Sequence, residues 1–151
     1  MNSKAALNDV HTVLVIDWPS IDVPESLAFA GFQVVVRGGP GPEDYSAYEL
    51  KNGAVIPRHV GRPPEHVDLI YSHRPLGELP QIIELAKKLG AKTIWTQSGL
   101  SAAGKNDPKG CWASEEDLRS ARDLAQSAGL NYLSQPYIGD TAREVKASQS
   151  A

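Results

Sequence analysis

Residues 67–99 read VDLIYSHRPLGELPQIIELAKKLGAKTIWTQSG, and this stretch decides the fold. Residues 67–71 and 92–96 are short runs rich in apolar and β-branched side chains, which is typical of strands buried in a parallel sheet. Between them, from about 76 to 89, apolar residues recur at the spacing of one helix face, and Gly90 suits the end of that helix. Strand, helix and strand in this order predict a βαβ unit with two parallel strands.

The same pattern continues on both sides of this unit. Three further strands are predicted, at residues 12–16, 32–36 and 131–133. Two further helices are predicted over about 24–30 and 114–128, each followed by a glycine suited to end it. Strands that alternate with helices favour an α/β, Rossmann-like fold. We expect an open parallel sheet of about five strands with helices on both faces.

Residues 43–66 do not fit the alternation. They contain two tyrosines and several turn-forming residues, among them Asn52-Gly53. An Asn-Gly pair favours a tight hairpin turn. We therefore expect an irregular excursion here, with a short hairpin around Asn52-Gly53.

Composition limits the classes of function. The chain has 151 residues, of which 41% are apolar and 22% charged, as expected for one globular domain over 1–151 with its core at about 12–138. A formal charge of −3 without basic clusters argues against a nucleic-acid partner. No apolar run approaches the roughly 20 residues needed to span a membrane, and the lone Cys111 cannot form an internal disulfide. These features predict a cytosolic protein.

In an open parallel sheet, ligands bind in the crevice outside the carboxyl ends of the strands. Four segments are expected to meet there, namely residues 17–20, 37–41, 72–75 and 97–99. Arg37 with Gly38 and Gly39 is either a turn or a cation beside backbone that a phosphate can approach closely. Arg74, just before a predicted helix, could pair with a phosphate near the N–H groups of the helix start.

Other motifs give no basis for catalysis. Residues 99–106 resemble a P-loop, but Asn106 replaces the hydroxyl that would hold magnesium. Three histidines at 59, 66 and 73 recur every seven residues, but the prolines between them prevent a helix from aligning them, so no metal site is predicted. The G-x-S-x-G elbow of hydrolases is absent, and no G-x-G-x-x-G follows the first strand, which disfavours an NAD(P)-dependent oxidoreductase.

Four short motifs follow one another in a characteristic order. They are V-D-L at 67–69, R-P at 74–75, G-A-K-x-x-W-x-Q-x-G at 90–99 and A-G-L at 128–130. On these motifs the sequence resembles the small bacterial CoA-binding domain proteins, relatives of the N-terminal domain of succinyl-CoA synthetase α subunits. With the first two strands included, the likeness covers most of residues 12–138. It implies a Rossmann-like fold and bound coenzyme A.

The resemblance also implies which residues contact the ligand. Those expected around the diphosphate and adenosine are Ser20, Arg37, Gly38, Gly39, Arg74, Pro75, Gln97, Ser98 and Gly99. The family's first strand usually runs into a small-residue loop that receives the CoA phosphates, whereas Asp17-Trp18 stand there in this chain, and a carboxylate repels phosphate.

Two hypotheses therefore stay open. The leading one is a small module that binds CoA, an acyl-CoA or a nucleotide without chemistry of its own. The alternative is a degenerate relative with a closed crevice that binds a protein partner. A homodimer is compatible with both.

Overall fold

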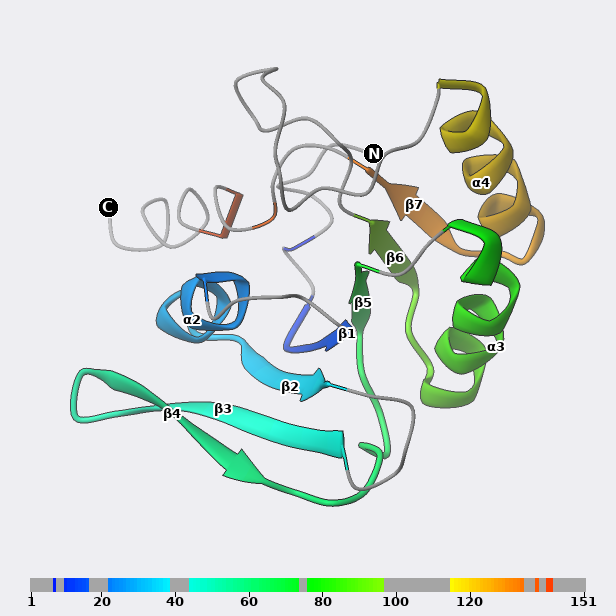
Figure 1. The fold of residues 1–151 in the computed structure, drawn as a ribbon. Helices are drawn as coiled ribbons and strands as arrows, with labels where there is room; N and C mark the ends of the chain where they lie inside the picture. Colours follow the sequence, from blue (N-terminus) through cyan, green and yellow to red (C-terminus); the bar gives the residue numbers. More distant parts are fainter. Residues whose placement is uncertain are drawn as a thin grey trace.

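The computed structural model describes residues 7, 10–16, 22–38, 44–73, 76–96, 115–134, 138 and 141–142. Its centre is one seven-stranded sheet with strand order β4-β3-β2-β1-β5-β6-β7 (Figure 1). None of the helices in the described part of the chain is long and apolar enough to cross a membrane.

Five neighbouring strands form the parallel part of the sheet. They are β1 (Thr12–Ile16), β2 (Gln33–Arg37), β5 (Leu69–Ser72), β6 (Thr93–Thr96) and β7 (Asn131–Leu133). β1 pairs in parallel with both β2 and β5, and β6 pairs in parallel with β5 and β7. The predicted Rossmann-like parallel sheet is thus confirmed, with strand bounds within two residues of those expected.

The remaining two strands form an antiparallel hairpin at one edge of the sheet. β3 (Tyr45–Lys51) pairs with β2 on one side and with β4 (Ala54–His59) on the other. Asn52 and Gly53 connect them with φ angles of 53° and 80°, which is the left-handed backbone that an Asn-Gly hairpin turn requires. The hairpin at Asn52-Gly53 is confirmed, but the expectation of an irregular excursion around it was wrong. The polar, weakly alternating sequence conceals strands because an exposed edge buries few side chains.

Pro57 lies in the middle of the edge strand β4, opposite Tyr48 of β3. In an antiparallel pair every second residue directs its N–H away from its partner. Counted from the two-residue turn, position 57 is one of these outward positions. Proline therefore removes no bond from the sheet, and it interrupts the row of outward donors that another strand would need.

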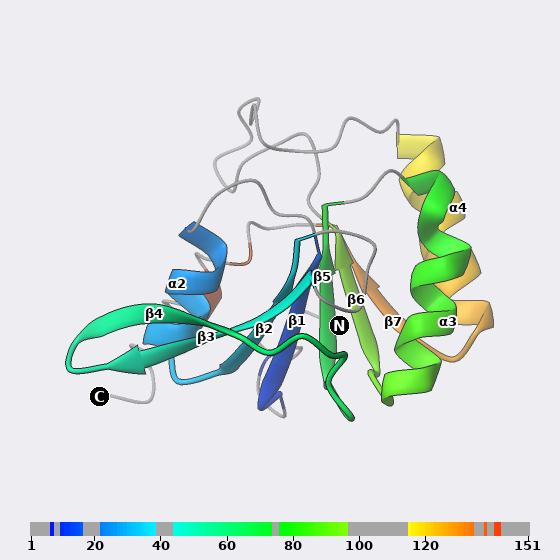
Figure 2. The ribbon, with the colours of Figure 1, turned by 60° about the horizontal axis from the view of Figure 1, so that its bottom comes forward.

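Helices cover the sheet from both sides, as predicted (Figures 1 and 2). α2 (Asp22–Phe29) packs against β2 and the hairpin on one face. On the other face lie the 3₁₀ turn η2 (Leu76–Glu78), α3 (Leu79–Leu89) and α4 (Glu115–Ser127). α3 ends as expected at Gly90, whose φ of 77° lets its N–H bond to the carbonyl oxygens of the last turn.

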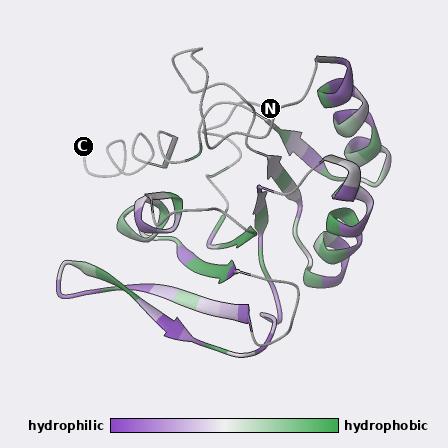
Figure 3. Cartoon of the chain, viewed as in Figure 1, coloured by the Kyte–Doolittle hydropathy of each residue, from purple (hydrophilic) through white to green (hydrophobic). Residues whose placement is uncertain are grey.

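Alternation along the strands divides the core into two clusters. Val13 and Val15 face α2, whereas Leu14 and Ile16 face α3 and α4, and all four are fully buried. Both faces of β1 are therefore apolar, as a strand in a sheet covered by helices on both sides requires. Figure 3 shows β1 and β2 in hydrophobic colours and much of the hairpin in pale or hydrophilic ones, which agrees with its place at the exposed edge.

Asp68 ties the amino ends of β1 and β5 together. Its Oδ2 accepts hydrogen bonds from the backbone N–H groups of His11 and Thr12, both 2.9 Å long. Its Oδ1 lies 2.9 Å from Nε2 of His66. Partial burial raises the pKa of Asp68, but the bonds from Thr12, His11 and His66 outweigh that effect and hold the pKa below its usual range. We call this group the Asp68 clamp.

Candidate functional site

The carboxyl ends of the parallel strands lie in one row. Ile16 is in register with Arg37 of β2 and with Ser72 of β5, and Ser72 is in register with Thr96 of β6. The N–H of His73 donates a 3.0 Å hydrogen bond to the carbonyl oxygen of Ile16, so the chain beyond β5 stays beside the end of β1. The segments expected at the crevice therefore start from a common edge.

Two polar side chains at this edge are buried, and one of them pairs with a residue of the neighbouring strand. Ser72 and Thr96 are almost completely buried. The hydroxyl of Thr96 lies 2.6 Å from that of Tyr132 on β7, with both groups inside the protein. A hydrogen bond between buried hydroxyls fixes the ends of β6 and β7 relative to each other. This pair therefore holds together two of the strands that lead to the crevice.

Arg37 is the cation at this edge. The alternation of β2 places it on the α3 face, directly opposite the buried Tyr45 of β3. Its side chain is half-buried, and its Nε is buried without a hydrogen-bond partner among the residues that the structure describes. A buried donor without a partner is costly, and more so when it carries charge. The guanidinium is therefore suited to an anionic ligand that supplies the acceptor.

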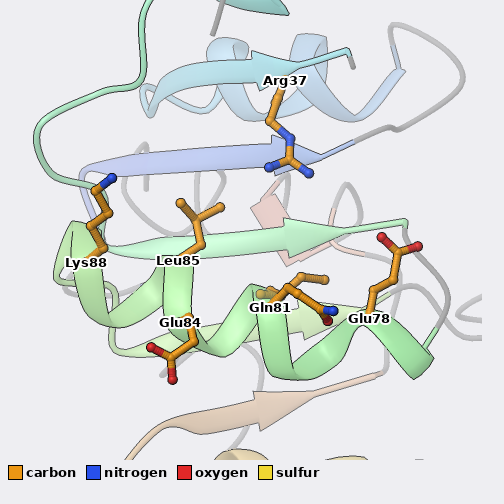
Figure 4. Close-up of a pocket in the computed structure, with 7 residues that line it drawn as sticks. Arg37, Glu78, Gln81, Glu84, Leu85 and Lys88 are labelled. Atoms are coloured by element: carbon orange, nitrogen blue, oxygen red, sulfur yellow. The ribbon is translucent and has the colours of Figure 1, made fainter. Parts of the chain in front are cut away.

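A hollow of about 420 Å³ opens beside Arg37, between β2 and α3 (Figure 4). Its lining consists of Arg37, Glu78, Gln81, Ile82, Glu84, Leu85 and Lys88. Figure 4 shows Arg37 reaching from β2 toward α3, while Lys88 points back from the last turn of α3. Glu84 points away from this space, and Glu78 lies toward the carboxyl ends of the strands. We call the hollow the α3 groove.

A larger hollow of about 830 Å³ lies elsewhere, at the amino end of β2. Phe32, Tyr48, Arg58 and Pro63 are among its lining residues. Arg58 is already engaged there, because its Nε pairs with the carboxylate of Glu49 and lowers the pKa of that carboxyl. Open α/β sheets bind their ligands at the carboxyl ends of the strands. The smaller α3 groove beside Arg37 is therefore the better candidate despite its size.

The structure describes two of the predicted contact residues, Arg37 and Gly38. Arg37 lines the groove, as described above. The N–H of Gly38 donates a 3.0 Å bond to the carbonyl oxygen of Asp44, so this amide is already engaged beside the start of β3. The other predicted contacts lie outside the described residues, namely Ser20, Gly39, Arg74, Pro75, Gln97, Ser98 and Gly99, as do Asp17-Trp18 and the P-loop-like segment 99–106.

Sequence reasoning missed the contribution of α3 to the groove. Gln81, Leu85 and Lys88 recur at intervals of four and three residues, so they share one flank of the helix beside its buried stripe. The sequence shows that these residues share one flank of the helix. Which flank faces a hollow depends on how the helix packs against the sheet. The described residues contain no group of three or more His, Cys, Asp or Glu side chains arranged to hold a metal ion.

Comparisons with known proteins agree with this fold. Two solved structures are similar over nearly the whole chain at 15% sequence identity, which shows the shared fold alone. One, "Prb (PH1109 protein redesigned for binding)", has a TM-score of 0.57 over 95% of this chain and 89% of its own. The other, cell-free ID.343 from Thermus thermophilus, has a TM-score of 0.55 over 96% of this chain and 99% of its own.

A search of curated proteins finds no significant match. The family model described as "CoA binding domain" matches residues 45–139, which is more than half of the chain. The match runs from β3 past β7 and does not include β1, α2 or β2. The chain therefore belongs to the CoA binding domain family.

Proposed function

We propose that the protein binds coenzyme A or a CoA thioester at the carboxyl ends of its parallel strands, with Arg37 on the diphosphate. The observation that carries this proposal is the buried Nε of Arg37, which lacks a partner in the described part of the chain and lines a hollow at that edge. A diphosphate offers several charged acceptors, and a guanidinium can bind two of them at once. Membership of the CoA binding domain family supports CoA as that ligand.

The proposal includes the contacts that the family resemblance implies. Arg74 and the segment from Gln97 to Gly99 would complete the phosphate and adenosine contacts, together with Ser20, Gly39 and Pro75. The protein would act as a binding module without catalysis of its own. We place it in the cytosol because of its composition and its lone cysteine.

Calorimetric titration with CoA tests this proposal, with thermal unfolding as a second readout. CoA at about a hundred times its Kd should stabilise the fold by roughly 2.7 kcal/mol, or about 5–10 °C in Tm. Arg37→Gln should weaken binding roughly 10- to 100-fold, because a charge-assisted hydrogen bond contributes about 1.5–3 kcal/mol.

Arg122→Gln is the matched control, since Arg122 is exposed on α4 and does not line the groove. Equal CoA affinity in the two variants would contradict the assignment of Arg37. An unchanged Tm for the native protein at millimolar CoA would contradict CoA binding itself.

The second candidate function is a protein-interaction module, for which each face of the hairpin offers one exposed apolar side chain. Leu50 and Ile56 are each nearly half exposed, at 45% and 47%, on the protruding β3–β4 hairpin. Substitution Asp17→Gly separates the two functions, because Asp17 directly follows β1 in the sequence, at the position where the family resemblance implies a phosphate-binding loop. If millimolar CoA shifts the Tm of Asp17→Gly but not that of the native protein, the interaction module is favoured.

A further inference from the structure

The α3 groove runs along the helix and not only beside Arg37. Gln81 and Lys88 are seven residues apart on α3, a rise of about 10 Å at 1.5 Å per residue. Glu78 lies at the end toward the carboxyl ends of the strands, and Lys88 lies at the other end (Figure 4). A ligand held only by its diphosphate at Arg37 would leave most of this length unused.

We infer that the α3 groove binds an extended arm of the ligand that carries an anionic group, with Arg37 at one contact and Lys88 at the other. The inference rests on the proposed function and specifies which part of the ligand α3 recognises. Two cations line the same space from β2 and α3. Of the two carboxylates in the lining, Glu84 points away from this space and Glu78 lies at its end toward the carboxyl ends of the strands, far from Lys88. Two positive charges that face one hollow attract an anion and repel each other when the hollow is empty.

The lining between the two cations suits a linear arm of mixed polarity. Ile82 and Leu85 offer apolar surface, and Gln81 offers an amide that can both donate and accept hydrogen bonds. The pantetheine arm of CoA alternates methylene groups with two amides, so it matches this lining. Ile82 is buried and Leu85 half-buried, so packing fixes both side chains before a ligand arrives.

The anion at Lys88 has two possible sources in CoA chemistry. One is the 3′-phosphate of the ribose, and the other is a carboxylate at the end of a dicarboxylic acyl group on the thiol. The carboxylate would lie at the far end of the pantetheine arm, whereas the 3′-phosphate lies on the adenosine side of the diphosphate, so each source places a different half of the ligand in the groove. A set of four ligands separates them, namely CoA, 3′-dephospho-CoA, acetyl-CoA and succinyl-CoA.

Lys88→Glu is the decisive variant, and the chain provides its control one residue earlier. Lys87 is in the same last turn of α3 and is exposed, but it does not line the groove. Lys87→Glu therefore makes the same change in net charge and in helix-end electrostatics. The dissociation constants of the four ligands are measured by calorimetry for the native protein and for both variants.

Lys88→Glu should weaken binding by about five- to tenfold relative to Lys87→Glu, as expected when an exposed ion pair becomes a repulsion. The difference should shrink at high salt. If CoA shows this difference and 3′-dephospho-CoA shows none, the 3′-phosphate is the group at Lys88. If succinyl-CoA shows a difference and acetyl-CoA shows none, the acyl carboxylate is that group. Equal affinities of both variants for all four ligands overturn the inference.

A titration with inorganic diphosphate distinguishes this failure from failure of the proposed function. NMR signals of the Arg37 Nε–H and the Lys88 side chain report on the groove directly. If CoA does not bind but diphosphate shifts both signals, and Lys88→Glu suppresses the shift, the groove is an anion site and the CoA assignment fails. If CoA binds and neither signal moves with CoA or with diphosphate, the CoA assignment stands and the groove is not its site.

Discussion

Replacing Asp68 by alanine should destabilise the fold more than any comparable change of a surface carboxylate. The variant loses two charge-assisted hydrogen bonds to backbone N–H groups, from His11 and Thr12. Such bonds contribute about 1.5–3 kcal/mol each when buried. The side chain of Asp68 is 24% exposed and the His11 amide is exposed, so water replaces part of the loss. We therefore expect the free energy of unfolding to fall by about 2–3 kcal/mol.

The contact with His66 should contribute little to this total. The His66 side chain is 60% exposed, and exposed ion pairs contribute under about 1 kcal/mol. His66→Ala should therefore cost much less than Asp68→Ala. Asp68→Asn should fall between them, because one oxygen can still accept a backbone hydrogen bond while the new NH₂ group faces a donor.

The effect should depend on pH in a defined direction. The pKa of Asp68 is lower in the folded state than in the unfolded chain. The stabilisation is therefore complete above the unfolded pKa of about 4 and is lost as the pH falls through the folded value. The difference in unfolding free energy between the native protein and Asp68→Ala should accordingly shrink in acid.

Urea unfolding followed by circular dichroism measures these differences, with the slope m as a check that the transition stays two-state. In thermal unfolding the loss corresponds to about 5–10 °C in Tm. Asp123→Ala is the control, since Asp123 is an exposed carboxylate on α4 and its removal should change stability by less than about 0.5 kcal/mol. Equal unfolding midpoints for Asp68→Ala and Asp123→Ala at neutral pH would refute the clamp.

Three further predictions concern single contacts. Gly90→Ala should lower the free energy of unfolding by more than about 1 kcal/mol, because the φ angle of Gly90 is 77° and an added Cβ would lie 2.8 Å from Nδ1 of His66. In a double-mutant cycle, His66→Ala should recover part of this loss. Tyr132→Phe should cost about 1–3 kcal/mol in urea unfolding, because it leaves the hydroxyl of Thr96 buried without its partner, and a cost near zero would contradict the bond. Pro57→Val should raise self-association, because it restores an outward N–H on the edge strand β4. Analytical ultracentrifugation measures this change, and an unchanged sedimentation profile would contradict the protective role of proline.

The local sequence was sufficient for most of the fold. Residues 12–16 were predicted as a strand with its exact bounds, because an unbroken apolar, β-branched run suits only the interior of a covered sheet. The helix after β5 and its end at Gly90 followed from apolar spacing and from glycine's tolerance of a left-handed backbone. The extent of the β3–β4 hairpin did not follow, since its strands are half-exposed and their stability comes from pairing with β2.

The candidate site divides in the same way. Arg37 could be named in advance because position along the chain places it at the carboxyl end of a strand, where Rossmann-like folds bind ligands. Its neighbours Gln81 and Lys88 could not, because they are more than forty residues away and reach the groove through the packing of α3 on the sheet. Asp68 was recognised as part of a family motif, yet its bonds to His11 and Thr12 span 57 and 56 residues. Hydropathy patterns and turn-forming residues act locally, so the sequence is sufficient to predict the strands, helices and turns that they form. The contacts of a charged side chain depend instead on which distant segments the sheet brings beside it.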